Sequence, residues 1–234
     1  MHETVNYLKE KYKRDKIIIA GHSLGTMLGS IYISKYPDDV DYYVGTGQVV
    51  DFKAGEHKAF EVLKEIASKN NDKKTLNELL KLGDDFPGDR NGREYIKEGA
   101  QFKRREEKYN LIENCFTFSI IKDFFMSPIF KWSDVSAMSR CGKVNETLVD
   151  ETIKFNIRNQ SEKYKVPIYF IMGENDWQTP YYLTKEYFDE IKAPRKKLYT
   201  IPDSGHLAVL EKPDLFYNIL ADIKAREDAF KLGI

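Results

Sequence analysis

Four short runs rich in apolar residues occur along this chain, at residues 17–20, 41–46, 166–172 and 197–201. Apolar runs of this length, without a strict polar alternation, are typical of strands that are covered on both faces, as in a parallel sheet. The four runs therefore predict a small, mostly parallel β-sheet.

Helical patterns flank the first of these runs. Residues 2–15 place Val5, Leu8 and Tyr12 at helical spacing, and a second amphipathic pattern covers residues 26–35. Strands that alternate with helices indicate the α/β class.

A long middle segment breaks this alternation. Residues 50–163 are charged, their apolar stripes recur at helical spacing, and no further strand of the sheet is predicted there. We interpret this segment as a helical insertion between the second and third strands. The predicted organisation is a core made of residues 1–49 and 164–234, interrupted by a helical domain at 50–163.

The pentapeptide Gly-His-Ser-Leu-Gly at residues 21–25 lies between the first apolar run and the helix that follows it. A G-x-S-x-G sequence at a strand-to-helix turn predicts a nucleophile elbow, in which Ser23 projects its hydroxyl at the carboxyl end of the strand. The flanking glycines suit a strained turn, because a residue without Cβ lets strand and helix approach closely. A chance match is the alternative, and the flanking strand and helix argue against it.

An acid and a histidine follow this serine in chain order, so the sequence resembles the α/β-hydrolase family. The third run ends in Gly-Glu-Asn-Asp-Trp-Gln-Thr-Pro, residues 173–180, where Asp176 matches the acid of the family. The fourth run is followed by Pro-Asp-Ser-Gly-His, and His206 matches the base. Glu174 is the alternative acid.

The position of His206 also favours the base role independently of the resemblance. The chain has four histidines. His2 lies at the terminus, His57 lies in a charged helical stretch, and His22 lies beside the serine. Only His206 lies in a loop after a predicted strand.

The chemistry that these residues predict is acyl transfer. His206 would accept the proton of Ser23 as the hydroxyl attacks a carbonyl, and Asp176 would orient the imidazole. The backbone N–H of Leu24, the residue after the nucleophile, would supply one donor of the oxyanion hole.

In the family, several strands and a His-Gly-Gly type oxyanion loop normally precede the elbow. This sequence shows neither before its elbow, where Ser23 is only the twenty-third residue. We expect a partial α/β-hydrolase fold in which residues 17–20 form an open edge. We expect this edge to be covered by a neighbouring copy, by an exchanged segment or by the N-terminal helix, and we therefore expect self-association.

Within the family, residues 47–51 and 173–180 resemble most closely the proline iminopeptidase branch, which removes N-terminal residues and holds the substrate amine with cap carboxylates. The sequence departs from that branch at Leu24, where a tryptophan is common. The following acids all remain open as amine ligands: Glu94, Glu98, Glu106, Glu107 and Glu113. An esterase or lactonase using the same triad, a weakly active remnant and a non-enzymatic interaction domain are the alternatives.

Aromatic segments of the insertion, residues 114–121 and 124–132, suit the apolar underside of a cap or its core. We expect Phe124, Phe125 and Trp132 to contact a small-molecule or short peptide substrate. Gln48, which follows the second strand, is a further candidate contact.

Composition and charge narrow the possible partners, location and cysteine chemistry of the protein. Lys+Arg and Asp+Glu are equal at 37 each, so the neutral chain favours neither nucleic acid nor an anionic membrane. No basic segment followed by an apolar stretch opens the chain, which predicts a cytoplasmic protein. Cys115 and Cys141 are too few for a disulfide framework or a metal site and are expected to be reduced and buried. No cofactor is expected.

Overall fold

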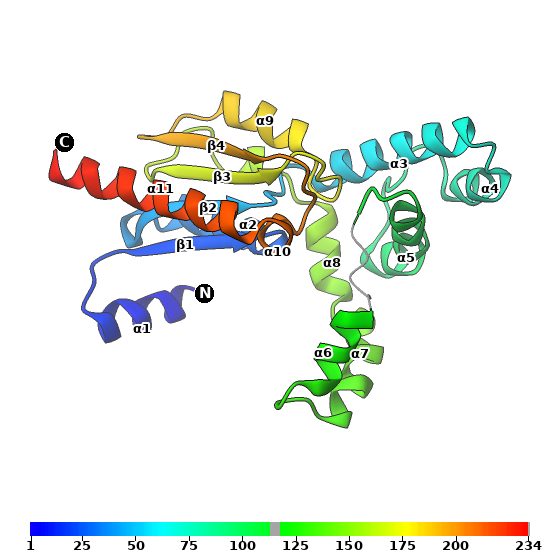
Figure 1. Cartoon of the computed structure of the whole chain (residues 1–234), viewed down its shortest axis with the longest axis horizontal. Helices are drawn as coiled ribbons and strands as arrows, with labels where there is room; N and C mark the ends of the chain where they lie inside the picture. The colour runs from blue at the N-terminus through cyan, green and yellow to red at the C-terminus, as the bar shows by residue number, and fades with distance from the viewer. Residues whose placement is uncertain (113–117, 234) are drawn as a thin grey trace. The chain divides into compact units, whose positions relative to one another are not determined.

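The computed structural model describes residues 1–112 and 118–233, in two compact units (Figure 1). The first unit contains Met1–Asp51 and Asn156–Ile234 and is called here the sheet unit, and the second contains Phe52–Phe155 and is called the helical unit. The helical unit ends before the expected residue 163, because residues 156–163 pack with the sheet unit.

A four-stranded parallel sheet forms the centre of the sheet unit, and the predicted α/β class is confirmed. The strands lie in chain order, β1-β2-β3-β4. Each predicted apolar run corresponds to one of them: β1 (Ile17–His22), β2 (Val40–Thr46), β3 (Ile168–Gly173) and β4 (Lys196–Ile201).

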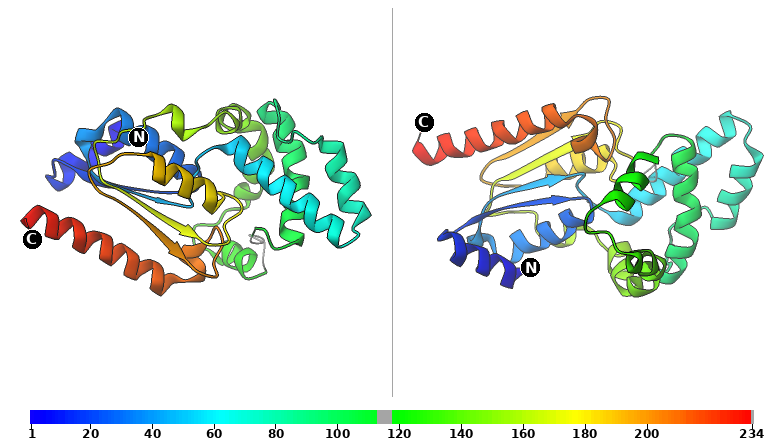
Figure 2. Two further views of the ribbon diagram at one scale, coloured as in Figure 1. Left: turned by 90° about the horizontal axis from the view of Figure 1, so that it is seen from above. Right: turned by 60° about the horizontal axis from the view of Figure 1, so that its bottom comes forward.

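Helices cover both faces of this sheet (Figure 2). On one face, Ile219 and Ile223 of α11 pack against Tyr42, Tyr169 and Ile171 of the strands. On the other face, the hydroxyl of Tyr43 donates to the carbonyl of Thr26 in α2. Burial of the central strands on both faces is what their continuous apolar sequence requires. The helices of this unit are α1 (His2–Tyr12), α2 (Leu24–Lys35), α9 (Tyr181–Glu190), α10 (Ala208–Glu211) and α11 (Pro213–Leu232), with short 3-10 turns at Pro37–Asp39 and Ile157–Asn159.

Strand β1 differs from the expectation that both of its faces are covered. Ile19 is buried beneath α2, whereas Ile18 and Ala20 on the opposite face are exposed. The core on that face is built from residues of β2, β3 and β4 with α10 and α11, so β1 lies outside it.

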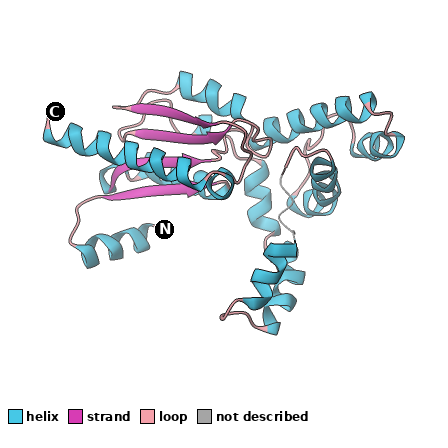
Figure 3. Cartoon of the chain, in the orientation of Figure 1, coloured by secondary structure: helices cyan, strands magenta, loops and turns pink. Residues whose placement is uncertain are grey.

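The helical unit contains no strand among its described residues (Figure 3). Its core is a cluster of rings, in which Phe86 lies 5.9 Å from Phe60 and 4.9 Å from Phe102, measured between ring centroids. Leu63 and Leu79, from the predicted apolar stripes, are also buried. The helices are α3 (Phe52–Lys69), α4 (Lys73–Leu82), α5 (Gly92–Lys108), α6 (Phe118–Met126), α7 (Trp132–Val144) and α8 (Glu146–Ile153). No helix among the described residues is long and apolar enough to cross a membrane.

A buried charge cluster joins α3 to α5 within the helical unit. The ammonium of Lys103 lies 2.6 Å from a carboxylate oxygen of Glu56 and 2.9 Å from one of Glu106. The hydroxyl of Tyr95 donates to the second oxygen of Glu56. Burial raises the pKa of the Glu106 carboxyl to about 7, because Lys103 offsets the desolvation only in part and the charge of Glu56 opposes ionisation.

We therefore predict that the helical unit loses stability as the pH rises through the range of this carboxyl. A group whose folded pKa lies above its unfolded value of 4.5 favours folding at low pH, and that contribution is lost between about 4.5 and about 7. Replacing Glu106 with glutamine removes the ionisation and is expected to raise the free energy of unfolding at pH 8 by up to about 3 kcal/mol. Urea denaturation across this pH range measures the effect.

Glu151→Gln is the control, because Glu151 is an exposed carboxylate on α8 of the same unit, and it should leave the pH dependence unchanged. A Glu106→Gln variant that retains the full slope of stability against pH would contradict the assignment to this carboxyl.

Candidate active site

Ser23 occupies a sharp turn between β1 and α2, as predicted. Its backbone has φ +53° and ψ −123°, a strained conformation for a residue with a side chain. A Cβ at Gly21 would lie 2.6 Å from the carbonyl oxygen of Gly25, so strand and helix approach at this point as only glycine allows. Gly25 itself has open space around its Cβ position, so of the two flanking glycines only Gly21 is required by the close approach.

Backbone and side-chain hydrogen bonds hold this turn. The N–H of Ser23 donates to the carbonyl of Thr46 at the end of β2. The N–H and the hydroxyl of Thr26 both donate to the carbonyl of Ser23, at 2.8 and 2.6 Å. The same hydroxyl accepts from the N–H of Val49 at 3.0 Å, which ties the turn to the loop after β2. Strain at Ser23 is thus maintained by contacts from two neighbouring segments.

Asp176 lies in the loop after β3 and is buried. One of its carboxylate oxygens accepts from the N–H of Thr179 at 2.8 Å. The other accepts from the Thr179 hydroxyl at 2.7 Å and lies 2.9 Å from Nδ1 of His206. Thr179 therefore fixes the carboxylate that faces the histidine, a role that the sequence analysis did not assign to it.

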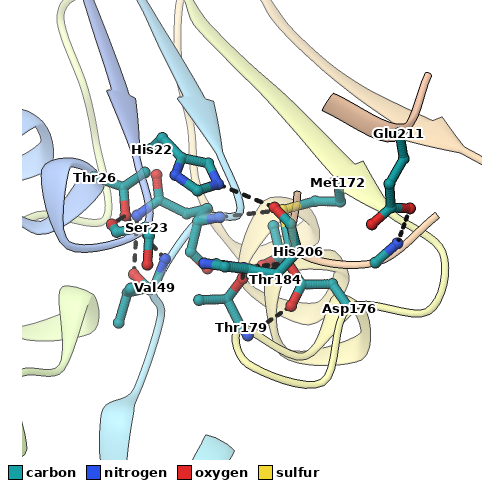
Figure 4. A network of polar contacts seen from close by, with 12 residues as sticks. His22, Ser23, Thr26, Val49, Met172, Asp176, Thr179, Thr184, His206 and Glu211 are labelled. Carbon is teal, nitrogen blue, oxygen red and sulfur yellow. Dashed lines mark hydrogen bonds and ion pairs between the residues drawn. The ribbon is translucent and has the colours of Figure 1, made fainter. Parts of the chain in front are cut away.

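His206 lies in the loop after β4 and reaches the elbow (Figure 4). Nε2 of His22, the residue before the serine, lies 3.0 Å from the carbonyl oxygen of His206, and the two rings are 4.8 Å apart between centroids. Gly47 adopts φ +53°, and a Cβ there would lie 2.9 Å from the His206 ring. The elbow, the acid loop and the histidine loop therefore meet at the carboxyl edge of the parallel strands.

The arrangement defines which proton each group can carry. With Nδ1–H of His206 donated to Asp176, the other ring nitrogen, Nε2, keeps its lone pair and can accept a proton.

Leu24 is the first residue of α2, and N–H groups in the first helical turn have no partner within the helix. Glu174, the alternative acid, is exposed and its carboxylate accepts from the N–H of Asp203.

Gln48, the predicted substrate contact after β2, is buried. Its amide oxygen accepts from the hydroxyl of Tyr43 at 2.9 Å, and its amide nitrogen donates to the carbonyl of Val49 at 2.9 Å. These contacts favour a structural role for Gln48, in holding the loop after β2, over a role in substrate binding.

The other predicted substrate contacts all belong to the helical unit. Phe124, Phe125 and Trp132 are exposed and pack with Phe130 in a cluster of rings, with the Phe130 and Trp132 centroids 5.5 Å apart. Their contact with a substrate remains a prediction. Cys141 is exposed rather than buried as expected, and Cys115 lies outside the described residues.

The candidate amine ligands of the helical unit differ in their surroundings. Glu106 is buried beside Lys103, Glu98 accepts from Arg90 at 2.6 Å, and the Glu94 carboxylate caps the start of α5. Glu107 is half-buried, and Glu113 lies outside the described residues. No group of three or more potential metal ligands occurs among the residues that the structure describes.

Comparison with known proteins agrees with this fold. The profile of the alpha/beta hydrolase fold matches residues 1–213, and the chain belongs to this family. A probable aminopeptidase of Bacillus subtilis, YbaC, is 24% identical over 226 residues, which cover 94% of this chain and 68% of that protein.

Two solved structures share this fold. The proline iminopeptidase of Mycobacterium smegmatis aligns with a TM-score of 0.53 at 14% identity, over 96% of this chain and 70% of its own. The monoacylglycerol lipase of Paleococcus ferrophilus aligns with the same TM-score of 0.53 at 15% identity, over 96% of this chain and 74% of its own. Likeness at this level shows the fold.

Proposed function

We propose that this hydrolase works by acyl transfer, with Ser23 as nucleophile, His206 as general base and Asp176 as the acid that orients the histidine. The observation that carries the proposal is the contact of 2.9 Å between Nδ1 of His206 and Asp176, in a histidine loop that touches the residue preceding Ser23. The strained backbone of Ser23 supports the nucleophile role, since strain of this kind is concentrated at functional sites.

The reaction then follows from the proton positions. Nε2 of His206 accepts the hydroxyl proton as the Ser23 oxygen forms a bond to the substrate carbonyl carbon. The imidazolium formed is stabilised by the buried Asp176 carboxylate, and it later returns the proton to the leaving group. The N–H of Leu24 donates to the negative oxygen of the intermediate. Water attacks the acyl-enzyme in the second half-reaction, again with His206 as base.

We propose an aminopeptidase of the proline iminopeptidase type, acting on small peptides or amides. The similarity to the probable aminopeptidase of Bacillus subtilis and the resemblance of residues 47–51 and 173–180 to that branch support this choice. A carboxylesterase or lactonase is the second candidate, because the same triad serves ester substrates and a structural neighbour is a monoacylglycerol lipase.

A matched pair of substrates tests this choice. We expect a prolyl arylamide with a free amine to be hydrolysed faster than the same arylamide carrying an N-acetyl group, because a carboxylate that holds the substrate amine has no charge to bind once it is acetylated. Initial rates measured with both arylamides and with a short-chain acyl ester give the comparison. Faster turnover of the ester than of the free-amine arylamide would favour the esterase over the aminopeptidase.

A further inference from the structure

The loop that carries His206 follows β4, whereas Ser23 follows β1 on the far side of β2 and β3. Neighbouring strands lie about 4.8 Å apart, so this loop has to reach across roughly 14 Å to bring its histidine to the elbow. A loop of that reach fixes its histidine only where contacts hold the main chain at the far end. The contacts of residues 204–206 therefore determine where the histidine lies.

The acid loop holds the first part of this segment by backbone contacts. The N–H of Asn175 donates to the carbonyl of Ser204 at 2.9 Å. A Cβ at Gly173 would overlap the carbonyl oxygen of Gly205, so the two loops approach as only glycine allows. These contacts fix residues 204 and 205 and leave the main chain beyond them to other groups.

Two side chains complete the hold on the main chain, one before and one after the α-carbon of His206 (Figure 4). The carboxylate of Glu211 accepts from the N–H of Gly205 at 3.0 Å. Nε2 of His22 lies 3.0 Å from the carbonyl oxygen of His206. A carbonyl oxygen can only accept, so Nε2 of His22 carries a proton and is the donor of this bond.

His22 precedes Ser23 directly in the chain, so its hydrogen bond links the turn of the nucleophile to the residue that carries the base. The other path between them runs through the strands, from β1 across β2 and β3 to β4. Catalytic groups have to be held to within about 0.5 Å, and supporting hydrogen bonds supply that hold. The bond of His22 is placed to do this for the distance between nucleophile and base.

We propose that His22 and Glu211 are positioning residues for His206, an inference that rests on the proposed triad. Asp176 fixes the ring through Nδ1, and the two positioning residues fix the main chain that carries the ring. Together they leave Nε2 in one place to accept the hydroxyl proton. Both positioning residues are exposed, so their hydrogen bonds contribute little to stability, and their loss should change the rate far more than the fold.

A pair of substitutions at His22 separates a hydrogen bond from simple packing. His22→Gln keeps an N–H donor at similar reach, whereas His22→Leu keeps an apolar side chain without a donor. We expect His22→Leu to lower kcat by about tenfold to a hundredfold with KM within about twofold, because displacement of a catalytic group by about 1 Å has an effect of this size. His22→Gln should stay within about threefold of the unaltered protein, since the donor is kept. Simple packing predicts the reverse order. Steady-state kinetics and thermal melts give the comparison.

Glu211 offers an independent test on the same loop. Glu211→Gln keeps an oxygen that accepts from Gly205, whereas Glu211→Met removes the acceptor at similar length, so only Glu211→Met should lower kcat. The double variant His22→Leu/Glu211→Met should lose less than the product of the two single losses, since both act through the position of one ring. His57→Leu is the matched control, because Nδ1 of His57 lies 3.1 Å from the carbonyl oxygen of Phe86 in the helical unit, and it should leave kcat unchanged.

The outcomes distinguish this inference from the proposed triad. A His22→Leu variant that keeps full kcat would overturn the role of His22, and so would a His22→Gln variant that loses as much as His22→Leu. Where His22→Leu fails to fold, the Glu211 pair decides by the same comparison. Turnover that survives Ser23→Ala would instead remove the triad, and the positioning roles with it.

Discussion

Replacing Ser23 with alanine is expected to lower kcat by a factor on the order of 10⁵–10⁶, because the His206–Asp176 pair then has no hydroxyl to deprotonate. The variant should also lose all covalent labelling at this position. A fluorophosphonate probe, which reacts with an activated serine, should label the unaltered protein and leave Ser23→Ala unlabelled. Turnover of the best substrate and mass spectrometry of the labelled peptide measure the two effects.

Ser34→Ala is the matched control for this variant. Ser34 lies in α2, on the same segment as the elbow, and its hydroxyl donates to the carbonyl of Ser30 within the helix, so its loss should leave labelling intact. Labelling or turnover that persists in Ser23→Ala would contradict the nucleophile assignment. A folded, unaltered protein that neither reacts with the probe nor turns over a substrate would favour the weakly active remnant or the interaction domain.

The strands and the elbow could be predicted because their signals are local. A buried strand needs a short apolar run, and a nucleophile turn needs glycine where strand and helix meet, as Gly21 shows by its close approach to Gly25. The exposure of Ile18 could not be predicted in this way. An apolar strand has the same sequence whether or not another element covers it, and coverage depends on the position of α11 across β2, β3 and β4.

The candidate site could be predicted in part, because some of its signals are also local in the sequence. The order of serine, acid and histidine is visible in the chain, whereas the contacts that hold them join loops far apart in sequence. Thr179 holds Asp176, and His22 contacts the carbonyl of His206, 184 residues further along the chain. In the sequence, Gly47 stands out only as part of residues 47–51, and its need for φ +53° beside the His206 ring is a property of the folded loop.

Asp176→Asn is expected to lower kcat by a factor on the order of 10⁴ while the fold is kept. Both carboxylate oxygens accept from donors, one from the N–H of Thr179 and the other from the Thr179 hydroxyl and Nδ1 of His206. The amide NH₂ of asparagine cannot accept at either position. Where it faces the ring, it donates to Nδ1 and shifts the ring proton to Nε2, the nitrogen that must accept the proton of Ser23. Steady-state kinetics and a thermal melt separate this effect from a loss of folding.

Glu174→Gln is the control that distinguishes the two acids of this loop. Glu174 is exposed and accepts only weakly from the N–H of Asp203, at 3.4 Å, so its replacement should change kcat by less than about threefold. A larger loss of kcat in Glu174→Gln than in Asp176→Asn would transfer the role of the acid to Glu174. The contacts of Asp176 predict a larger loss of kcat in Asp176→Asn than in Glu174→Gln. A buried carboxylate that holds Nδ1 of the histidine acts on its tautomer directly, whereas a solvated carboxylate on the loop surface does not.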